Sequence, residues 1–112
     1  MNKSKFELLV DDFRREQDKL LDVKGHDYTG GNQDRLFNFK EVATMVGMTP
    51  LQVWSIYWLK HVFAICTFIK DGDVKSESID SRFFDEANYN LLGLALIKEA
   101  RDAKKEEEDI PF

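Results

Sequence analysis

Carboxylate, amide and hydroxyl side chains recur at helical spacing between residues 77 and 88. Glu77, Ser81, Asp85 and Asn88 follow one another at i, i+4, i+8 and i+11, which places them on one face of a helix. An apolar stripe of the same helix borders this polar stripe. A carboxylate in such a position is partly removed from water and needs a cation, a metal ion or hydrogen-bond donors. Asp85 is therefore the centre of a candidate site.

Several basic side chains are candidate partners for Asp85. Lys60 and His61 lie in the middle of a long apolar segment, and Arg82 precedes Asp85 in its own helix. Two interpretations stay open. One is a structural network that joins Asp85 and Asn88 to His61 or Lys60, and the other is a ligand site. A histidine inside an apolar segment is more often a hydrogen-bonded core residue than a metal ligand.

Four predicted helices position these residues. No alternating pattern indicates strands, so the sequence predicts an all-α, four-helix bundle-like domain over residues 1–103. The first expected helix runs from Ser4, with Glu7 completing a capping box, to Gly25, and the second is capped by Asp34 and ends at Gly47. The third starts at Thr49-Pro50, is apolar up to Ile69 and is closed by residues 71–73, and the fourth runs from residues 76–78 to Ala103.

The third of these segments is apolar on nearly every side. Such a helix lies either at the centre of a bundle or in an oligomer interface. Its Cys66 is the single cysteine of the chain, which rules out an intrachain disulfide, and we expect it to be a small buried hydrophobic residue. Because a chain of 112 residues buries only a modest fraction of its surface, a homo-oligomer is expected.

Residues 24–34 contain three glycines and several Asx residues, which predicts a loop. Lys24 supplies positive charge there, and the Gly30-Gly31 pair allows backbone N–H groups to approach a phosphate. The spacing differs from that of a Walker loop. A plain connection between helices is the alternative interpretation.

The formal net charge of −5 is concentrated at one end of the sequence. Four negative charges fall in residues 106–109, which leaves about −1 for the rest of the chain, so charge neither requires nor excludes a nucleic-acid partner. The first residues do not resemble a signal peptide, and Lys60-His61 would be costly within a lipid bilayer. A cytoplasmic protein without membrane association is expected.

Residues 104–112 lack helical periodicity and are predicted to form a disordered acidic tail. The final residues, Asp109, Ile110, Pro111 and Phe112, resemble the C-terminal tip of bacterial single-stranded-DNA-binding proteins. Pro111 favours an extended chain, so the ring and carboxylate of Phe112 suit an apolar pocket edged by Arg or Lys. The resemblance implies that these four residues dock host DNA-maintenance proteins.

Four segments of the body carry a second resemblance. Residues 24–28, 34–40, 58–61 and 76–89 are similar, in that order, to small phage and prophage proteins of the nucleotide-modification-associated type. More distantly, the chain resembles the all-α MazG-like nucleotide pyrophosphohydrolases, in which acidic residues of two helices hold Mg²⁺. That family has an acid one turn before its second-helix Asp, where this chain has Ser81 or Arg82.

The MazG-like resemblance implies two sets of site residues. The predicted Mg²⁺ ligands are Asp85, Glu77, Asp12 and Glu16. The predicted nucleotide-binding residues are Lys60, His61, Asn88, Arg82 and Lys24.

Three functional expectations follow. The first is a phage-type accessory protein of DNA replication, recombination or nucleotide metabolism, whose tip recruits host proteins. The second is a Mg²⁺-dependent nucleoside triphosphate pyrophosphohydrolase. The third is an oligomer that binds single-stranded DNA by stacking bases on exposed aromatic residues. Those aromatic residues would be Tyr28, Phe37, Trp54 or Trp58, although burial in the core is the more common role of such side chains.

Overall fold

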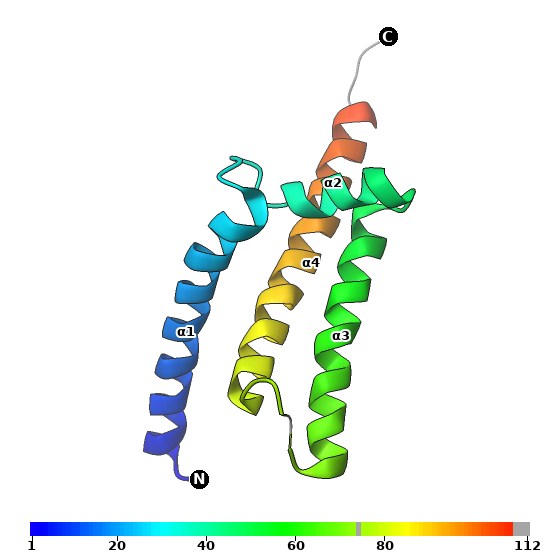
Figure 1. Cartoon of the computed structure of the whole chain (residues 1–112). Helices are drawn as coiled ribbons and strands as arrows, with labels where there is room; N and C mark the ends of the chain where they lie inside the picture. Colours follow the sequence, from blue (N-terminus) through cyan, green and yellow to red (C-terminus); the bar gives the residue numbers. More distant parts are fainter. Residues whose placement is uncertain (74, 109–112) are drawn as a thin grey trace.

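The computed structural model describes residues 1–73 and 75–108, and every regular element within these ranges is an α-helix (Figure 1). This confirms the predicted all-α class. The helices are α1 (Lys3–Thr29), α2 (Phe37–Val46), α3 (Pro50–Asp71) and α4 (Ile79–Glu108).

Three long helices lie alongside one another, and the short α2 crosses one end of them (Figure 1). Helix α4 packs against α3 and α1, and α2 bridges α1 and α3. Helices α1 and α3 make no backbone approach to each other within the described residues. The two outer helices are therefore held together through α4 and α2.

Helix α3 begins and ends where the sequence predicted. Thr49 caps its N-terminus in a capping box: the Thr49 hydroxyl accepts from Gln52 N at 3.1 Å, and Gln52 Oε1 accepts from Thr49 N at 2.9 Å. Pro50 occupies the first turn, and Gly72 follows the last residue of the helix. Gly47 ends α2, also as expected.

The predicted bounds of the first helix were wrong at both ends. Asn2, rather than Ser4, caps α1 through its side chain, which accepts from Lys5 N at 2.9 Å. The helix continues through Gly25 and ends at Gly30, whose φ of 60° suits glycine. Gly25 serves close packing: a Cβ there would lie 2.9 Å from Arg35 Nε. Residues 24–29 are therefore helical, and not part of the predicted loop.

Helix α4 continues to Glu108, past the predicted end near Ala103. Residues 104–108 of the expected acidic tail are thus helical, because lysine and glutamate sustain a helix without an apolar stripe. The predictions for Asp109, Ile110, Pro111 and Phe112 lie outside the described residues. The predicted start of the second helix was wrong, because α2 begins at Phe37 with Leu36 in the N-cap position. Asp34 lies in the turn before the helix, where its carboxylate accepts from Leu36 N at 3.0 Å.

The apolar core lies at the end of the molecule that α2 crosses. Phe39 of α2 is its best-buried aromatic residue, and its ring packs edge-on against Tyr57 and Tyr89 at centroid distances of 6.4 and 6.3 Å. Next to it, Trp54 of α3 lies directly against Gly93 of α4, where a Cβ would overlap the indole ring. The buried hydrophobic residues are Leu36, Phe39, Ala43, Val53, Tyr89, Leu92 and Leu96.

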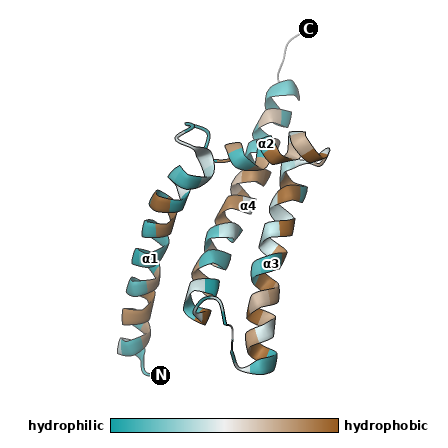
Figure 2. Ribbon diagram, in the orientation of Figure 1, coloured by the Kyte–Doolittle hydropathy of each residue, from teal (hydrophilic) through white to brown (hydrophobic). Residues whose placement is uncertain are grey.

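Helix α3 is apolar along much of its length (Figure 2), and several of its apolar side chains are exposed. Only Val53 of α3 is fully buried, whereas Ile56, Leu59 and Phe63 are exposed. Cys66 is exposed as well, so its predicted burial was wrong. No helix in the described part of the chain is long and apolar enough to span a membrane.

Candidate functional site

A buried ion pair joins α1 to α4 at the centre of the predicted site. Lys24 Nζ donates to Asp85 Oδ1 at 2.6 Å. Asp85 is 5% exposed, so its charge is removed from water and depends on Lys24. Burial lowers the pKa of Lys24, but its hydrogen bond to Asp85 and the charge of that carboxylate outweigh burial, so the pKa is raised. The Lys24 amine is therefore protonated at neutral pH.

Asn88 lies one turn after Asp85 and is the most deeply buried polar residue of α4. It is 1% exposed, and neither atom of its amide group has a hydrogen-bond partner. Burying an amide without partners costs roughly 2 kcal/mol or more. An unsatisfied group of this kind is retained where it meets water or a ligand.

His61 and Arg82 complete the surroundings of Asp85. The His61 ring packs against Tyr89 with centroids 4.8 Å apart, and its Nδ1 is buried without a partner. Burial lowers the pKa of His61 more than the nearby Asp85 raises it, so the imidazole is neutral at pH 7. Arg82 donates to Ser76 Oγ at 2.8 Å and lies near Glu77, while its Nε is buried without a hydrogen bond.

We call these five residues the polar cluster: Lys24, His61, Arg82, Asp85 and Asn88. The structure brings together four of the five predicted nucleotide-binding residues around Asp85. Lys60, the fifth, is exposed and lies on a flank of α3, to one side of the face that carries Trp54, Trp58 and His61. One helix turn holds 3.6 residues, so the adjacent positions 60 and 61 diverge by about 100°.

A cavity of about 270 Å³ opens beside the ion pair between α1 and α4. Glu16, Glu77 and Asp85 all line it, together with Lys24. Three of the four predicted metal ligands therefore share one cavity. Asp12, the fourth, is not among its lining residues and instead forms an exposed ion pair with Arg15.

The carboxylates of this cavity have the oxygen chemistry that Mg²⁺ prefers. Among residues 1–73 and 75–108, however, no three His, Cys, Asp or Glu side chains are close enough together to hold a metal ion. Lys24 already occupies one oxygen of Asp85. As arranged, Asp85 is paired with a lysine of the chain itself instead of presenting both oxygens to a metal ion.

Three residues outside the predicted set have the same unsatisfied character as Asn88. Both terminal nitrogens of Arg35, Oδ1 of Asn38 and Oε2 of Glu86 are buried without hydrogen bonds. Arg35 lies over Gly25, next to Lys24 in α1. The segment 34–40 was noted for its family resemblance, and a basic residue directly before a helix was the signal that could have pointed to Arg35.

The aromatic residues considered for base stacking serve the packing of the helices. Trp54 and Trp58 stack on each other with centroids 5.6 Å apart. Their Nε1 groups donate to Tyr89 O at 2.7 Å and to Asn90 Oδ1 at 2.8 Å, so both indoles are attached to α4. Tyr28 and Phe37 are half-buried. None of the four is a freely exposed ring.

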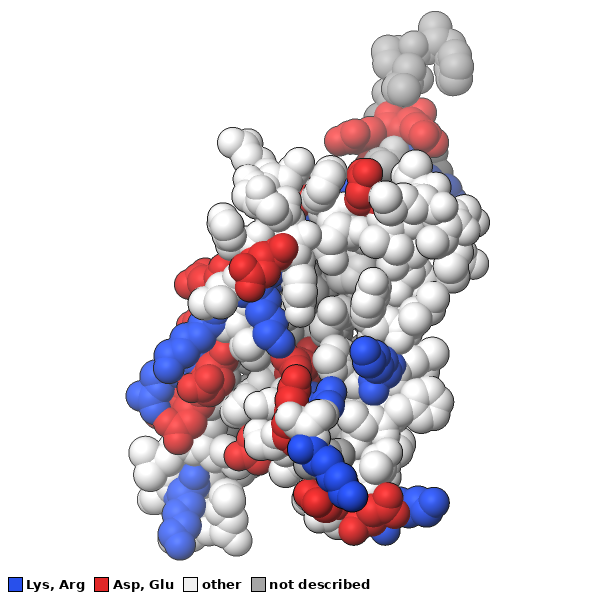
Figure 3. Space-filling view, in the orientation of Figure 1, with Lys and Arg blue, Asp and Glu red and all other residues white. Residues whose placement is uncertain are grey.

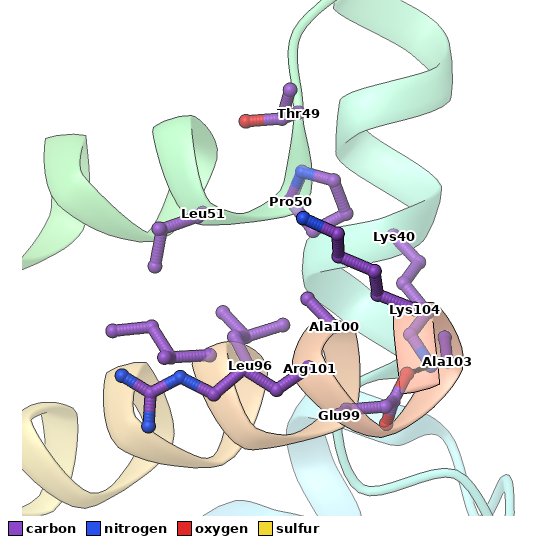
Figure 4. A pocket seen from close by; sticks show the side chains of 11 residues that line it. Lys40, Thr49, Pro50, Leu51, Leu96, Glu99, Ala100, Arg101, Ala103 and Lys104 are labelled. Carbon is purple, nitrogen blue, oxygen red and sulfur yellow. Dashed lines mark ion pairs between the residues drawn. The ribbon is translucent and has the colours of Figure 1, made fainter. Parts of the chain in front are cut away.

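A second cavity, of about 480 Å³, lies far from the polar cluster, between the start of α3 and the later part of α4 (Figure 4). Pro50, Leu51 and Leu96 form its apolar walls, and Arg101 and Lys104 lie at its edge. None of the predicted site residues lines it. This apolar cavity is therefore separate from the residues of the polar cluster.

The charged surface is mixed. On the face shown in Figure 3, acidic and basic side chains alternate along α1, and few charged residues lie on α3. This face carries no continuous basic band of the kind that follows a nucleic-acid backbone.

Comparisons with protein-family models, with curated proteins and with solved structures give no match to this chain. The fold and the site together define an all-α domain with a polar cluster buried between α1, α3 and α4. The function is therefore inferred from the chemistry of the polar cluster.

Proposed function

We propose that this protein is an accessory factor of nucleotide metabolism or DNA replication and that its helical domain binds a nucleotide at the polar cluster. The observation that carries the proposal is Asn88, which is buried beside the Lys24–Asp85 pair with both amide atoms unsatisfied. An amide that offers one donor group and one acceptor suits the edge of a nucleobase.

Three unsatisfied nitrogen atoms have the chemistry that suits the phosphate part of a nucleotide. Arg82 Nε and the two terminal nitrogens of Arg35 are donors, and they are buried without hydrogen-bond partners. Phosphate oxygens accept hydrogen bonds from guanidinium groups in pairs. The order of motifs along the chain, which resembles nucleotide-modification-associated phage proteins, supports the same class of ligand.

The substitution Asn88→Leu distinguishes between two interpretations of the polar cluster, a ligand site and a structural network. For a ligand site, we expect Asn88→Leu to abolish nucleotide binding and to raise the free energy of unfolding, because an unsatisfied amide is replaced by an apolar group of similar size. Calorimetric titration with deoxynucleoside mono- and triphosphates and urea unfolding provide the two measurements. Asn90→Leu, the same change at an exposed position of the same helix, is the control for nucleotide binding and should leave it unchanged. In urea unfolding this variant should lose stability, because it removes the acceptor of Trp58 Nε1.

The opposite result would favour the structural interpretation. If Asn88→Leu destabilises the fold while the wild type binds none of the nucleotides, the amide belongs to a packing network. Binding by the wild type that survives the substitution would place the ligand elsewhere.

A second candidate function is Mg²⁺-dependent pyrophosphohydrolysis. Its support is that Glu16, Glu77 and Asp85 line the same cavity. Mg²⁺ held there would offset the phosphate charge during attack by water, after displacing Lys24 from Asp85. The test is pyrophosphate release from a panel of nucleoside triphosphates with Mg²⁺. Absence of release, or release that Asp85→Asn leaves unchanged, argues against it.

We further propose that residues Asp109, Ile110, Pro111 and Phe112 recruit host DNA-maintenance proteins in the cytoplasm, and that the chain acts as a homo-oligomer. The acidic-apolar sequence supports recruitment, since a basic, apolar pocket would hold its charges and its aromatic ring together. Pull-downs from bacterial lysate should lose specific partners when Phe112 is removed. Identical partners with and without Phe112 would contradict recruitment.

A further inference from the structure

A stripe of exposed residues follows the side of α3 that faces away from α4. Gln52, Ile56, Leu59, Phe63, Cys66 and Lys70 succeed one another at alternating spacings of four and three residues. We call these six residues the α3 stripe. Its apolar members are strongly exposed: 55% for Ile56, 43% for Leu59 and 68% for Phe63. Alternating spacings of four and three are the pattern by which one helix packs along another.

The molecule exposes more surface area, and has a larger radius of gyration, than a compact monomer of the same size. It exposes 8469 Å², whereas a compact monomer of 13.1 kDa exposes about 6,400 Å². Its radius of gyration is 17.2 Å, against about 13 Å expected for 112 residues. The excess is more than the area that a stable dimer buries, roughly 800 Å² per partner.

The α3 stripe is complementary to itself when reversed. Its spacings read the same in both directions, so two antiparallel copies align all six positions. In that register, Leu59 meets Phe63 of the second copy, Ile56 meets Cys66, and Gln52 meets Lys70. A parallel pairing would instead set Lys70 against Lys70, which is unfavourable between like charges.

From this geometry we infer that two copies of the chain associate through antiparallel packing of their α3 stripes. The inference rests on the proposed homo-oligomer and adds its surface, orientation and register. It places the polar cluster on the outer side of each copy, since His61 lies on the opposite side of α3 from Leu59 and Phe63. Lys60 flanks the stripe, where its amine stays in water.

Oligomer mass tests whether the surface is the α3 stripe. Light scattering should give twice the 13.1 kDa chain mass for the wild type. Phe63→Glu should weaken association roughly 30-fold or more, because a buried apolar anchor is replaced by a charge. Adding Leu59→Lys should restore it, since the introduced lysine would then face the introduced glutamate of the second copy. Phe83→Glu, at another exposed aromatic position on α4, is the control and should leave association unchanged.

Three outcomes would overturn the inference in distinguishable ways. A monomeric wild type would remove both the oligomer and its surface. An oligomer that tolerates Phe63→Glu would keep the oligomer and reject the stripe. A Phe63→Glu defect that Leu59→Lys fails to rescue would reject the antiparallel register. Circular dichroism of each variant verifies that it has folded.

Disulfide formation tests the orientation independently. In the antiparallel register, the two Cys66 residues are about 15 Å apart along the helices, too far for a bond. Ile56→Cys places a thiol opposite Cys66 of the second copy and should form a covalent dimer roughly tenfold faster than the wild type. Phe83→Cys is the control. Linkage of the wild type as fast as that of Ile56→Cys would show the parallel arrangement instead, because Cys66 would then face Cys66 of the second copy.

Discussion

The Lys24–Asp85 ion pair is unevenly buried, and this asymmetry makes its two halves respond differently to substitution. The Asp85 side chain is 6% exposed and that of Lys24 is 31% exposed. If Lys24 is lost, a buried carboxylate has no cation. If Asp85 is lost, the lysine amine can turn toward water.

We therefore expect Lys24→Met to lower the free energy of unfolding by roughly 3 kcal/mol, because it leaves an uncompensated buried charge. Asp85→Asn should cost less, about 1 kcal/mol. Urea unfolding at neutral pH measures both, with Lys5→Met as an exposed control. Equal costs for the two variants would contradict the asymmetry.

His61 makes stability depend on pH. Burial lowers its pKa in the folded protein below the ordinary value of 6.5, so the unfolded chain binds more protons in the window just below 6.5. This contribution to stability is present above pH 6.5 and is lost as the pH falls through the lowered pKa. Burial raises the pKa of Glu86, which acts in the opposite direction, but only nearer its ordinary value of 4.5.

The expected result is a fall in the unfolding free energy between about pH 7.5 and about pH 5.5. His61→Gln should flatten that profile, because no proton is then taken up on unfolding at this position. Urea unfolding at a series of pH values for the two proteins is the measurement. Parallel profiles for wild type and variant would rule out His61 as the source.

At the residue scale, the sequence indicated which residues of the last helix would lie together. The polar stripe on one face of that helix contains Asp85 and Asn88, and the structure buries both. The polar stripe could not show that Lys24, 61 positions away, would be the cation bound to Asp85. That choice depends on how α1 packs on α4, and the nearer candidate Lys60 lies on a flank of α3.

At the scale of elements, glycine was the main source of error. Gly25 and Gly30 look alike in the sequence, yet the first packs inside α1 and the second ends it. The difference comes from Arg35, which lies over Gly25 and is brought there by the tertiary fold. Ends marked by a capping box or by one isolated glycine, as in α3, were predicted correctly because their signals are local.

Gly93 fixes how closely α3 and α4 approach. We expect Gly93→Ala to destabilise the protein by about 1–3 kcal/mol, because the added Cβ would overlap the Trp54 indole, although alanine favours the helix by about 1 kcal/mol. Combining it with Trp54→Phe should recover part of the loss. Unfolding free energies of the single and double variants give the coupling, and strict additivity would contradict the contact.

At the scale of the whole molecule, the small core and large surface imply that stability depends on concentration. Association of folded chains stabilises them by mass action, so the midpoint of thermal unfolding should rise as protein concentration rises. The rise should disappear in Phe63→Glu. Scanning calorimetry over a hundredfold range of concentration is the measurement, and a constant midpoint for the wild type would contradict the prediction.

The contact between Trp54 and Gly93 also limits how the molecule can move. A one-turn slip of α4 along α3 would shift Asp85 by about 5.4 Å and separate it from Lys24, and the indole at Gly93 obstructs such a slip. The backbone of helix α1 does not approach that of α3 in the described chain, and Gly30 and Gly31 begin its connection to α2. We therefore expect any opening of the polar cluster to separate α1 from α4, because the Trp54–Gly93 contact holds α3 against α4.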